Sequence, residues 1–243
     1  MADFSGPPPA LDPDHARRSL EEGDSAWERR YEPGGLEAAR RAYFEAAAAD
    51  PSLYDAYWKA ARSSNAIGER AASPEARADA FRRGVGAARL GIERQPDRAE
   101  AHYLYALSLG LHARERPSTG VESVKEMVPH LDQAAQADPD FDFAGPHRAL
   151  ALVYLRAPGW PVSVGDEAAG LTEARTAVER APEYPPNHLA LAEALAANGM
   201  PDEARDAVRQ AIALAGSGPW TDEERRGFRD EADRLSRDLP GGR

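Results

Sequence analysis

Four prolines divide most of the sequence into units of similar length, and this repetition is the strongest constraint on the fold. Pro51, Pro96, Pro139 and Pro182 each lie between two amphipathic stretches and are 45, 43 and 43 positions apart. Proline disfavours the helical conformation in the residue before it, so each of these prolines marks a boundary between helices. A regular period of this length indicates stacked helical units, each of which buries its apolar face against its neighbours.

The last unit shows the pattern within one repeat most clearly. From Pro182 to Gly216, a span of 34 positions, the sequence predicts a helix, a turn at residues 198–199 and a second helix. Glycine and asparagine tolerate the left-handed conformation that ends helices, and Pro201 suits the first turn of the next helix. This stretch resembles a tetratricopeptide repeat (TPR), whose period is about 34 residues.

The other units carry additional residues within or between their helices. We therefore expect an all-α fold, a right-handed α-solenoid of about five TPR-like helix pairs, followed by a C-terminal capping helix that begins after Thr221. The expected domain covers residues 13–238, with a flexible tail at residues 1–12 and a short tail at residues 239–243. Pro129 should kink or interrupt its helix, because proline removes a backbone donor and clashes with the preceding turn.

Composition excludes several classes of function. The net charge of −11 and the pI near 5.1 argue against nucleic acid as a partner, because no basic stripe is available. The chain has no cysteine, which excludes disulfides and thiolate zinc sites, and no apolar run approaches the roughly 20 residues of a membrane span. Neither a Gly-x-Ser-x-Gly nor a His-Glu-x-x-His motif occurs, so we expect a non-enzymatic protein without a cofactor.

Three histidines occupy similar places in the first helices of successive units, namely His102, His147 and His188. Equivalent positions in stacked repeats lie about 10 Å apart, so one metal ion could not bridge them. The sequence therefore predicts structural or partner-contacting histidines and no metal site.

One further resemblance covers about residues 37–214. Residues 145–150, Tyr154, and residues 157–161, 165–166 and 181–187 resemble the T-component family of tripartite ATP-independent periplasmic (TRAP) transporters. The resemblance implies degenerate TPRs, association with a periplasmic solute-binding protein and a ring-shaped homo-oligomer. It also implies that an export signal has been removed.

Two functions are compatible with these features. The first is a T-component-like scaffold that binds a solute-binding protein and helps to hold an apolar small molecule. The alternative is a cytoplasmic TPR adaptor that binds a peptide segment of a partner protein. As it begins, the sequence shows no basic segment followed by an apolar core, which favours the cytoplasm, whereas the transporter resemblance implies the periplasm.

The first helices of stacked repeats line the concave face, which is the expected binding groove. The repeat pattern directs both charged and apolar side chains towards it: Asp55, Trp58, Arg62, Asn65, Glu100, Tyr103, Leu107, Arg148, Leu152, Leu189 and Glu193. The alternative is that Trp58, Tyr103, Leu107 and Leu152 form the core between repeats. Trp160, in the loop of residues 157–165, is either packed under that loop or offered to a partner.

Overall fold

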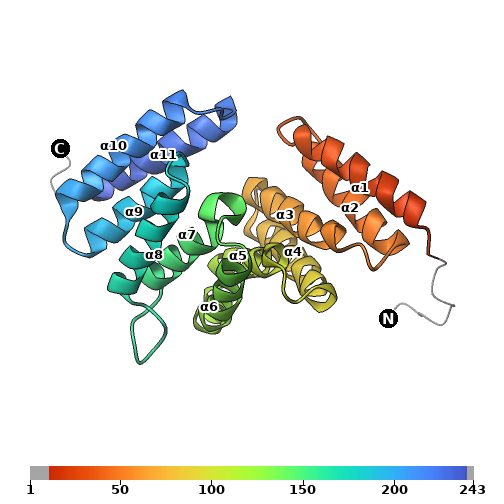
Figure 1. The fold of residues 1–243 in the computed structure, drawn as a ribbon, viewed down its shortest axis with the longest axis horizontal. Helices are drawn as coiled ribbons and strands as arrows, with labels where there is room; N and C mark the ends of the chain where they lie inside the picture. Colours follow the sequence, from red (N-terminus) through yellow and green to blue (C-terminus); the bar gives the residue numbers. More distant parts are fainter. Residues whose placement is uncertain (1–10, 240–243) are drawn as a thin grey trace. The chain divides into compact units, whose positions relative to one another are not determined.

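The computed structural model describes residues 11–239 of the 243-residue chain. Within that range eleven α-helices and one short 3-10 helix follow one another, with no β-strand (Figure 1). The helices form five successive antiparallel pairs and a terminal helix, which confirms the predicted all-α helical-repeat class. The chain divides into two compact units, unit 1 at residues 1–96 and unit 2 at residues 97–243. The prediction of a single domain over residues 13–238 stays a prediction.

Unit 1 contains two helix pairs. Its helices are α1 (Pro13–Glu28), α2 (Gly35–Ala49), α3 (Tyr54–Arg70) and α4 (Pro74–Arg94). Each pair is closed by a glycine on one helix beneath an aromatic ring on the other. A Cβ atom on Gly23 would overlap the ring of Tyr43, and one on Gly68 would overlap the ring of Phe81. Both rings are fully buried, so these glycines set the close approach of the paired helices.

Unit 2 contains three helix pairs and the terminal helix. Its helices are α5 (Ala99–Glu115), η1 (Pro117–Thr119), α6 (Gly120–Ala137), α7 (Phe141–Arg156), α8 (Glu167–Arg180), α9 (Pro185–Ala197), α10 (Pro201–Ser217) and α11 (Asp222–Asp238). One core cluster joins alanine and leucine side chains of α7 through α11. Leu239 is 6% exposed and belongs to this core, although it was assigned to the C-terminal tail.

Several predicted helix ends are confirmed. Asp166 caps α8 by accepting from the amide of Ala169, Thr221 forms a capping box with Glu224, and Gly199 has φ = 74° at the end of α9. Asp12 caps α1, while residues 1–10 of the expected N-terminal tail lie outside the described residues.

Of the two effects expected of Pro129, the interruption is wrong, because α6 continues through this residue as one helix. The expected kink stays a prediction. Proline removes one hydrogen bond from a helix. Here Met127, Leu131 and Ala134 are buried on both sides of Pro129, and their packing holds the helix together.

Candidate functional site

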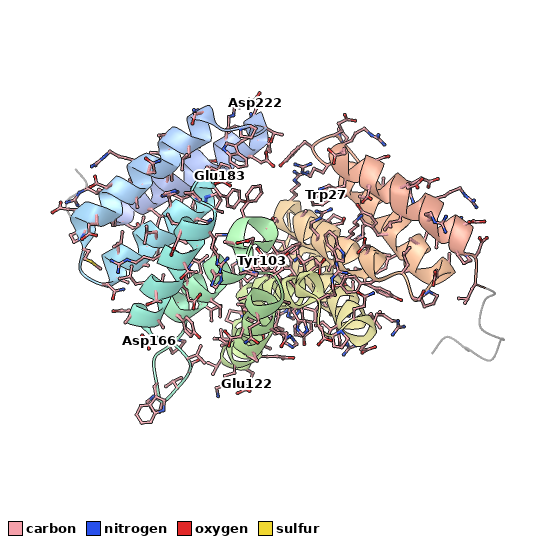
Figure 2. All side chains as sticks on the ribbon, viewed as in Figure 1. Trp27, Tyr103, Glu122, Asp166, Glu183 and Asp222 are labelled. Atoms are coloured by element: carbon pink, nitrogen blue, oxygen red, sulfur yellow. The ribbon has the colours of Figure 1, made fainter. Side chains whose placement is uncertain are left out.

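A cation between two indole rings forms the clearest candidate site in unit 1. The guanidinium carbon of Arg62 lies 4.0 Å from the ring centroid of Trp27 and 5.0 Å from that of Trp58. Trp58 Nε1 donates to Asp55 Oδ1 at 3.0 Å. The rings come from α1 and α3, the first helices of successive pairs, and Figure 2 labels Trp27 near the end of α1. We call Trp27, Asp55, Trp58 and Arg62 the arginine–tryptophan cluster.

The sequence periodicity places this cluster on one stripe of α3. Asp55, Trp58, Arg62 and Asn65 are separated by three, four and three positions, the spacing of one helix face. Trp58 and Arg62 are half-buried, whereas Asn65 is only 7% exposed. The sequence thus brought four candidate residues to one face, while Trp27, in the sparsely apolar first helix, was missed.

Asp24 fixes the three helices around the cluster. Its carboxylate accepts from Tyr43 Oη at 2.8 Å and from Lys59 Nζ at 2.8 Å, so α1, α2 and α3 are joined through one residue. Burial, reinforced by the hydrogen bond to Asp24, raises the pKa of Tyr43 above its ordinary value. The tyrosine therefore stays neutral and keeps donating to Asp24.

A second group of cations and aromatics lies at the turn between α1 and α2. The guanidinium groups of Arg30 and Arg70 lie 4.6 and 5.0 Å from the ring centroid of Tyr31. These residues line a pocket of about 280 Å³ together with residues 32–34, Leu36 and Glu37. Sequence reasoning missed this pocket because Arg30, Tyr31 and Arg70 lie at helix ends, outside the apolar stripes.

In unit 2 the candidate Arg148 holds a polar network that is mostly buried. Its Nη2 donates to Tyr103 Oη at 3.1 Å and to Asp142 Oδ2 at 3.0 Å, and its Nη1 donates to Asn187 Oδ1 at 3.0 Å. Tyr103 Oη donates to the same Asp142 oxygen at 2.6 Å. Burial, followed by the charge of Asp142, raises the pKa of Tyr103 well above its ordinary value.

This network supports an unusual stretch of backbone. Asp142, Phe143 and Ala144 have φ values of 52°, 56° and 58°, a left-handed conformation that residues other than glycine seldom adopt. The carbonyl of Phe143 accepts from Arg148 Nη1 at 3.2 Å and from Asn187 Nδ2 at 3.1 Å. The predicted right-handed helix from Phe143 onwards therefore begins only after this left-handed turn.

The remaining unit 2 candidates are buried, half-buried or paired. Leu189 is 5% exposed in the core, so its side chain does not line a surface. Glu193 forms a two-pronged ion pair with Arg156 at 2.7 and 2.8 Å, and Glu100 pairs with Arg98. Leu107 and Leu152 are half-buried. A role in partner binding for these residues stays a prediction.

Trp160 is not packed under its loop, and its contact with a partner stays a prediction. Its side chain is 88% exposed, and Val162 is 55% exposed. The loop is nevertheless held by its own backbone, since the amide of Gly165 donates to the Pro158 carbonyl at 2.9 Å and that of Val162 to the Gly159 carbonyl at 3.1 Å. Figure 1 shows the segment between α7 and α8 projecting away from both helices.

The three histidines have separate partners. His102 Nδ1 lies 2.7 Å from His130 Nδ1, His147 Nδ1 lies 2.7 Å from Glu173 Oε2, and His188 Nε2 lies 2.7 Å from the Pro182 carbonyl. Among residues 11–239 no three His, Asp or Glu side chains gather in a way that could hold a metal ion.

The His102–His130 pair predicts a pH-dependent stability. Burial, followed by the charge of His102, lowers the pKa of His130 in the folded protein. The unfolded chain then binds protons more tightly than the folded protein does. The free energy of unfolding is therefore largest above the ordinary histidine pKa of about 6.5, and it decreases as the pH is lowered below that value. Urea unfolding at about pH 7.5 and 5.5 should show a smaller loss for His130→Gln than for wild type. His15→Gln, on an exposed residue, is the control, and equal losses in all three proteins would contradict the prediction.

No helix within the described range combines the length and the apolar character that a bilayer crossing requires. The comparison with curated protein sequences gave no match.

The fold is similar to that of solved TPR proteins. A thermophilic TPR protein of Thermus thermophilus superimposes with a TM-score of 0.66 at 18% identity, over 90% of this chain and 99% of that chain. MamA from Desulfovibrio magneticus RS-1 superimposes with a TM-score of 0.57 at 17% identity, over 87% of this chain and 100% of that chain. PilW, a type IV pilus biogenesis factor, superimposes with a TM-score of 0.58 at 14% identity, over 92% of this chain and 91% of that chain. At these identities the likeness supports the fold alone.

The sequence model of one protein family covers much of the repeat region. It is described as Regulator of microtubule dynamics protein 1-3 and matches residues 20–144, just over half of the chain. The matched stretch includes the whole arginine–tryptophan cluster and ends within the left-handed turn. The chain therefore belongs to the family of regulator of microtubule dynamics proteins 1-3, and its helices have the tetratricopeptide-repeat arrangement.

Proposed function

We propose that this protein is a non-enzymatic scaffold that binds a peptide segment of a partner protein through the first helices of its repeats. The arginine–tryptophan cluster is the observation that carries the proposal. Tryptophan and arginine are the residues most enriched among the energetically dominant contacts of protein interfaces. In this cluster they are half-buried on the first helices α1 and α3, and Asp24 holds the supporting helices in place.

The cluster offers a peptide both apolar area and polar contacts. Two indole rings supply rigid apolar surface at a low cost in side-chain entropy, and the Arg62 guanidinium between them supplies donors and charge. The neighbouring pocket of about 280 Å³ adds Arg30 and Arg70 on the same unit. This combination suits an extended segment with an apolar anchor and an acceptor group.

Selection from a phage-displayed library of random peptides tests this proposal. Wild-type protein should yield peptides whose affinity falls about tenfold or more with Trp58→Ala or Arg62→Ala, as expected for dominant interface residues. Leu90→Ala is the matched control, because Leu90 is also partly exposed, at 38%, but lies on the second helix α4 of the same pair.

Circular dichroism melting of each variant separates lost binding from lost folding. If no peptide is recovered, or if folded Trp58→Ala and Arg62→Ala bind as wild type does, the cluster is not the recognition surface.

The TRAP T-component role is a narrower form of the same proposal. The matching family and the three structures described above are not described as T-components. Several residues that carry the resemblance serve the fold, since Pro146 is buried and Asn187 supports the left-handed turn. Sedimentation and native mass spectrometry test this role, because it requires a ring-shaped homo-oligomer and a bound apolar molecule or solute-binding protein.

The family description points to another partner class. A function in microtubule dynamics would be one instance of scaffold binding, and co-sedimentation with polymerised tubulin would test it directly. The peptide-binding scaffold proposed above depends on neither tubulin nor a transporter.

A further inference from the structure

Four aromatic side chains from separate segments of unit 2 meet at one place. Phe143 stacks on Tyr184 with ring centroids 4.5 Å apart, and Trp220 lies 5.5 Å from Tyr184 and 5.7 Å from Phe228. They come from the start of α7, the turn before α9, the α10–α11 link and α11. We call Phe143, Tyr184, Trp220 and Phe228 the aromatic patch.

The patch is open to solvent on one side. Phe143 is 43% exposed, and the other three side chains are half-buried. An exposed phenylalanine ring adds nothing to the packing of the core. Nevertheless, three consecutive residues in the left-handed conformation, Phe143 among them, hold this ring at the surface. Backbone strain of this kind costs about 1–3 kcal/mol per residue and persists only where the surroundings over-determine it. Arg148 and Asn187 provide that support, so the position of Phe143 is specifically maintained.

The charge around the patch indicates what it would attract. Unit 2 has 25 Asp and Glu against 16 Lys and Arg, whereas unit 1 has 16 against 14, so most of the negative charge belongs to unit 2. Glu183 and Asp222 are exposed at the N-terminal ends of α9 and α11, beside Tyr184 and Trp220 in sequence, and Figure 2 labels both. Neither carboxylate forms an ion pair with another described residue.

The patch already accepts one cation. The guanidinium carbon of Arg148, whose side chain is 12% exposed, lies 5.0 Å from the ring centroid of Tyr184. Aromatic faces attract ammonium and guanidinium groups, and carboxylates close by strengthen the attraction. The exposed ring of Phe143 offers apolar contact beside them.

We infer that the aromatic patch is a docking site for a cationic segment of a partner protein, in which Lys or Arg side chains flank an apolar anchor. The inference rests on the proposed scaffold function and adds a partner chemistry for a second set of residues, all of which belong to unit 2. The apolar anchor would contact Phe143, while the cations would meet Glu183, Asp222 and the aromatic faces.

The probe is a fluorescein-labelled amphipathic peptide of leucine and lysine, about 14 residues or four helical turns long. Its partner probe has glutamate in place of every lysine. Fluorescence anisotropy should show binding of the lysine peptide and none of the glutamate peptide. The affinity should fall in about 0.3 M salt, where charges are screened beyond a few ångströms.

Phe143→Asn removes the ring but keeps the turn, because asparagine tolerates the left-handed conformation better than most residues. It should weaken binding of the lysine peptide about tenfold, the loss expected for an interface anchor. Ile212→Asn is the matched control, since Ile212 is 39% exposed on α10 of the same unit. That control should change the affinity by less than about twofold, as for contacts outside an interface.

Two charge variants test the acidic border. Glu183→Gln combined with Asp222→Asn should weaken binding several-fold and reduce its salt dependence. Glu203→Gln combined with Asp238→Asn removes the same charge at the far ends of α10 and α11, which are each 17 residues or about 25 Å long. This control pair should bind nearly as wild type does.

Several outcomes would overturn the inference. These are equal binding of both peptides, unchanged binding by Phe143→Asn, equal losses in both charge pairs, and burial of the patch by self-association in sedimentation. The inference would also be wrong if the protein bound neutral phosphatidylcholine vesicles more tightly than the lysine peptide, because the patch would then favour a membrane over a protein partner. Trp58→Ala should leave binding of the lysine peptide intact. A failure of the inference about the aromatic patch can therefore be distinguished from a failure of the proposed scaffold function.

Discussion

Replacing Arg148 with methionine is expected to lower the free energy of unfolding by about 2–4 kcal/mol, because the substitution removes a buried charge that donates several hydrogen bonds. The Arg148 side chain is only 12% exposed and donates to Tyr103, Asp142 and Asn187. Methionine fills similar volume but leaves the carbonyl of Phe143 and the Asp142 carboxylate with fewer donors. The left-handed turn would then lose the support that offsets its strain.

Urea unfolding followed by circular dichroism measures this effect. Arg148→Lys should recover only part of the stability, because an ammonium group cannot match the forked geometry of guanidinium. Arg156→Met is the control, since its side chain is 52% exposed and its pairing with Glu193 should contribute about 1 kcal/mol or less. A loss with Arg148→Met no larger than that of Arg156→Met would show that the network does not stabilise the turn.

Phe81→Ala is expected to lower the free energy of unfolding by about 3–5 kcal/mol, the usual cost of emptying a fully buried aromatic site. Phe81 is completely buried in unit 1, with its ring against Gly68. Gly68→Ala should itself cost about 1–3 kcal/mol, because the new methyl group overlaps a ring that cannot move aside.

The sign of the Gly68→Ala effect should reverse in the Phe81→Ala background. Once the ring is gone, alanine fits the space and is better than glycine inside a helix by about 0.5–1 kcal/mol. A thermodynamic cycle of the four proteins measures this coupling. Gly86→Ala is the control, because Gly86 has open space around its Cβ position. Additive effects of the two substitutions would refute the close contact between Gly68 and Phe81.

The helices and their ends could be predicted from sequence because their signals are local. Proline boundaries, the cap Asp166 and the turn glycine Gly199 each act within a few residues, and the structure has them where they were expected. The interruption at Pro129 failed for the opposite reason. A local rule was overridden by the packing of side chains on both sides of the proline.

The left-handed turn at residues 142–144 could not be predicted, because its causes are distant in sequence. None of its three residues is glycine or asparagine, and two of its supports, Tyr103 and Asn187, lie about 40 positions away in either direction. The candidate site shows the same division. The stripe on α3 follows from periodicity, whereas Trp27 joins it only through the contact of α1 with α3. Leu189 is buried although a groove position was expected, because the groove and core positions of one helix lie a single residue apart.

The loop between α7 and α8 gives the protein a native optical reporter. Of its four tryptophans, Trp160 is the one that stands largely in water, at 88% exposure, while Trp27, Trp58 and Trp220 are half-buried. Its emission should therefore be red-shifted and readily quenched by iodide. Any partner that covers this loop would shift the emission to the blue, whereas a ligand held elsewhere would leave that component unchanged.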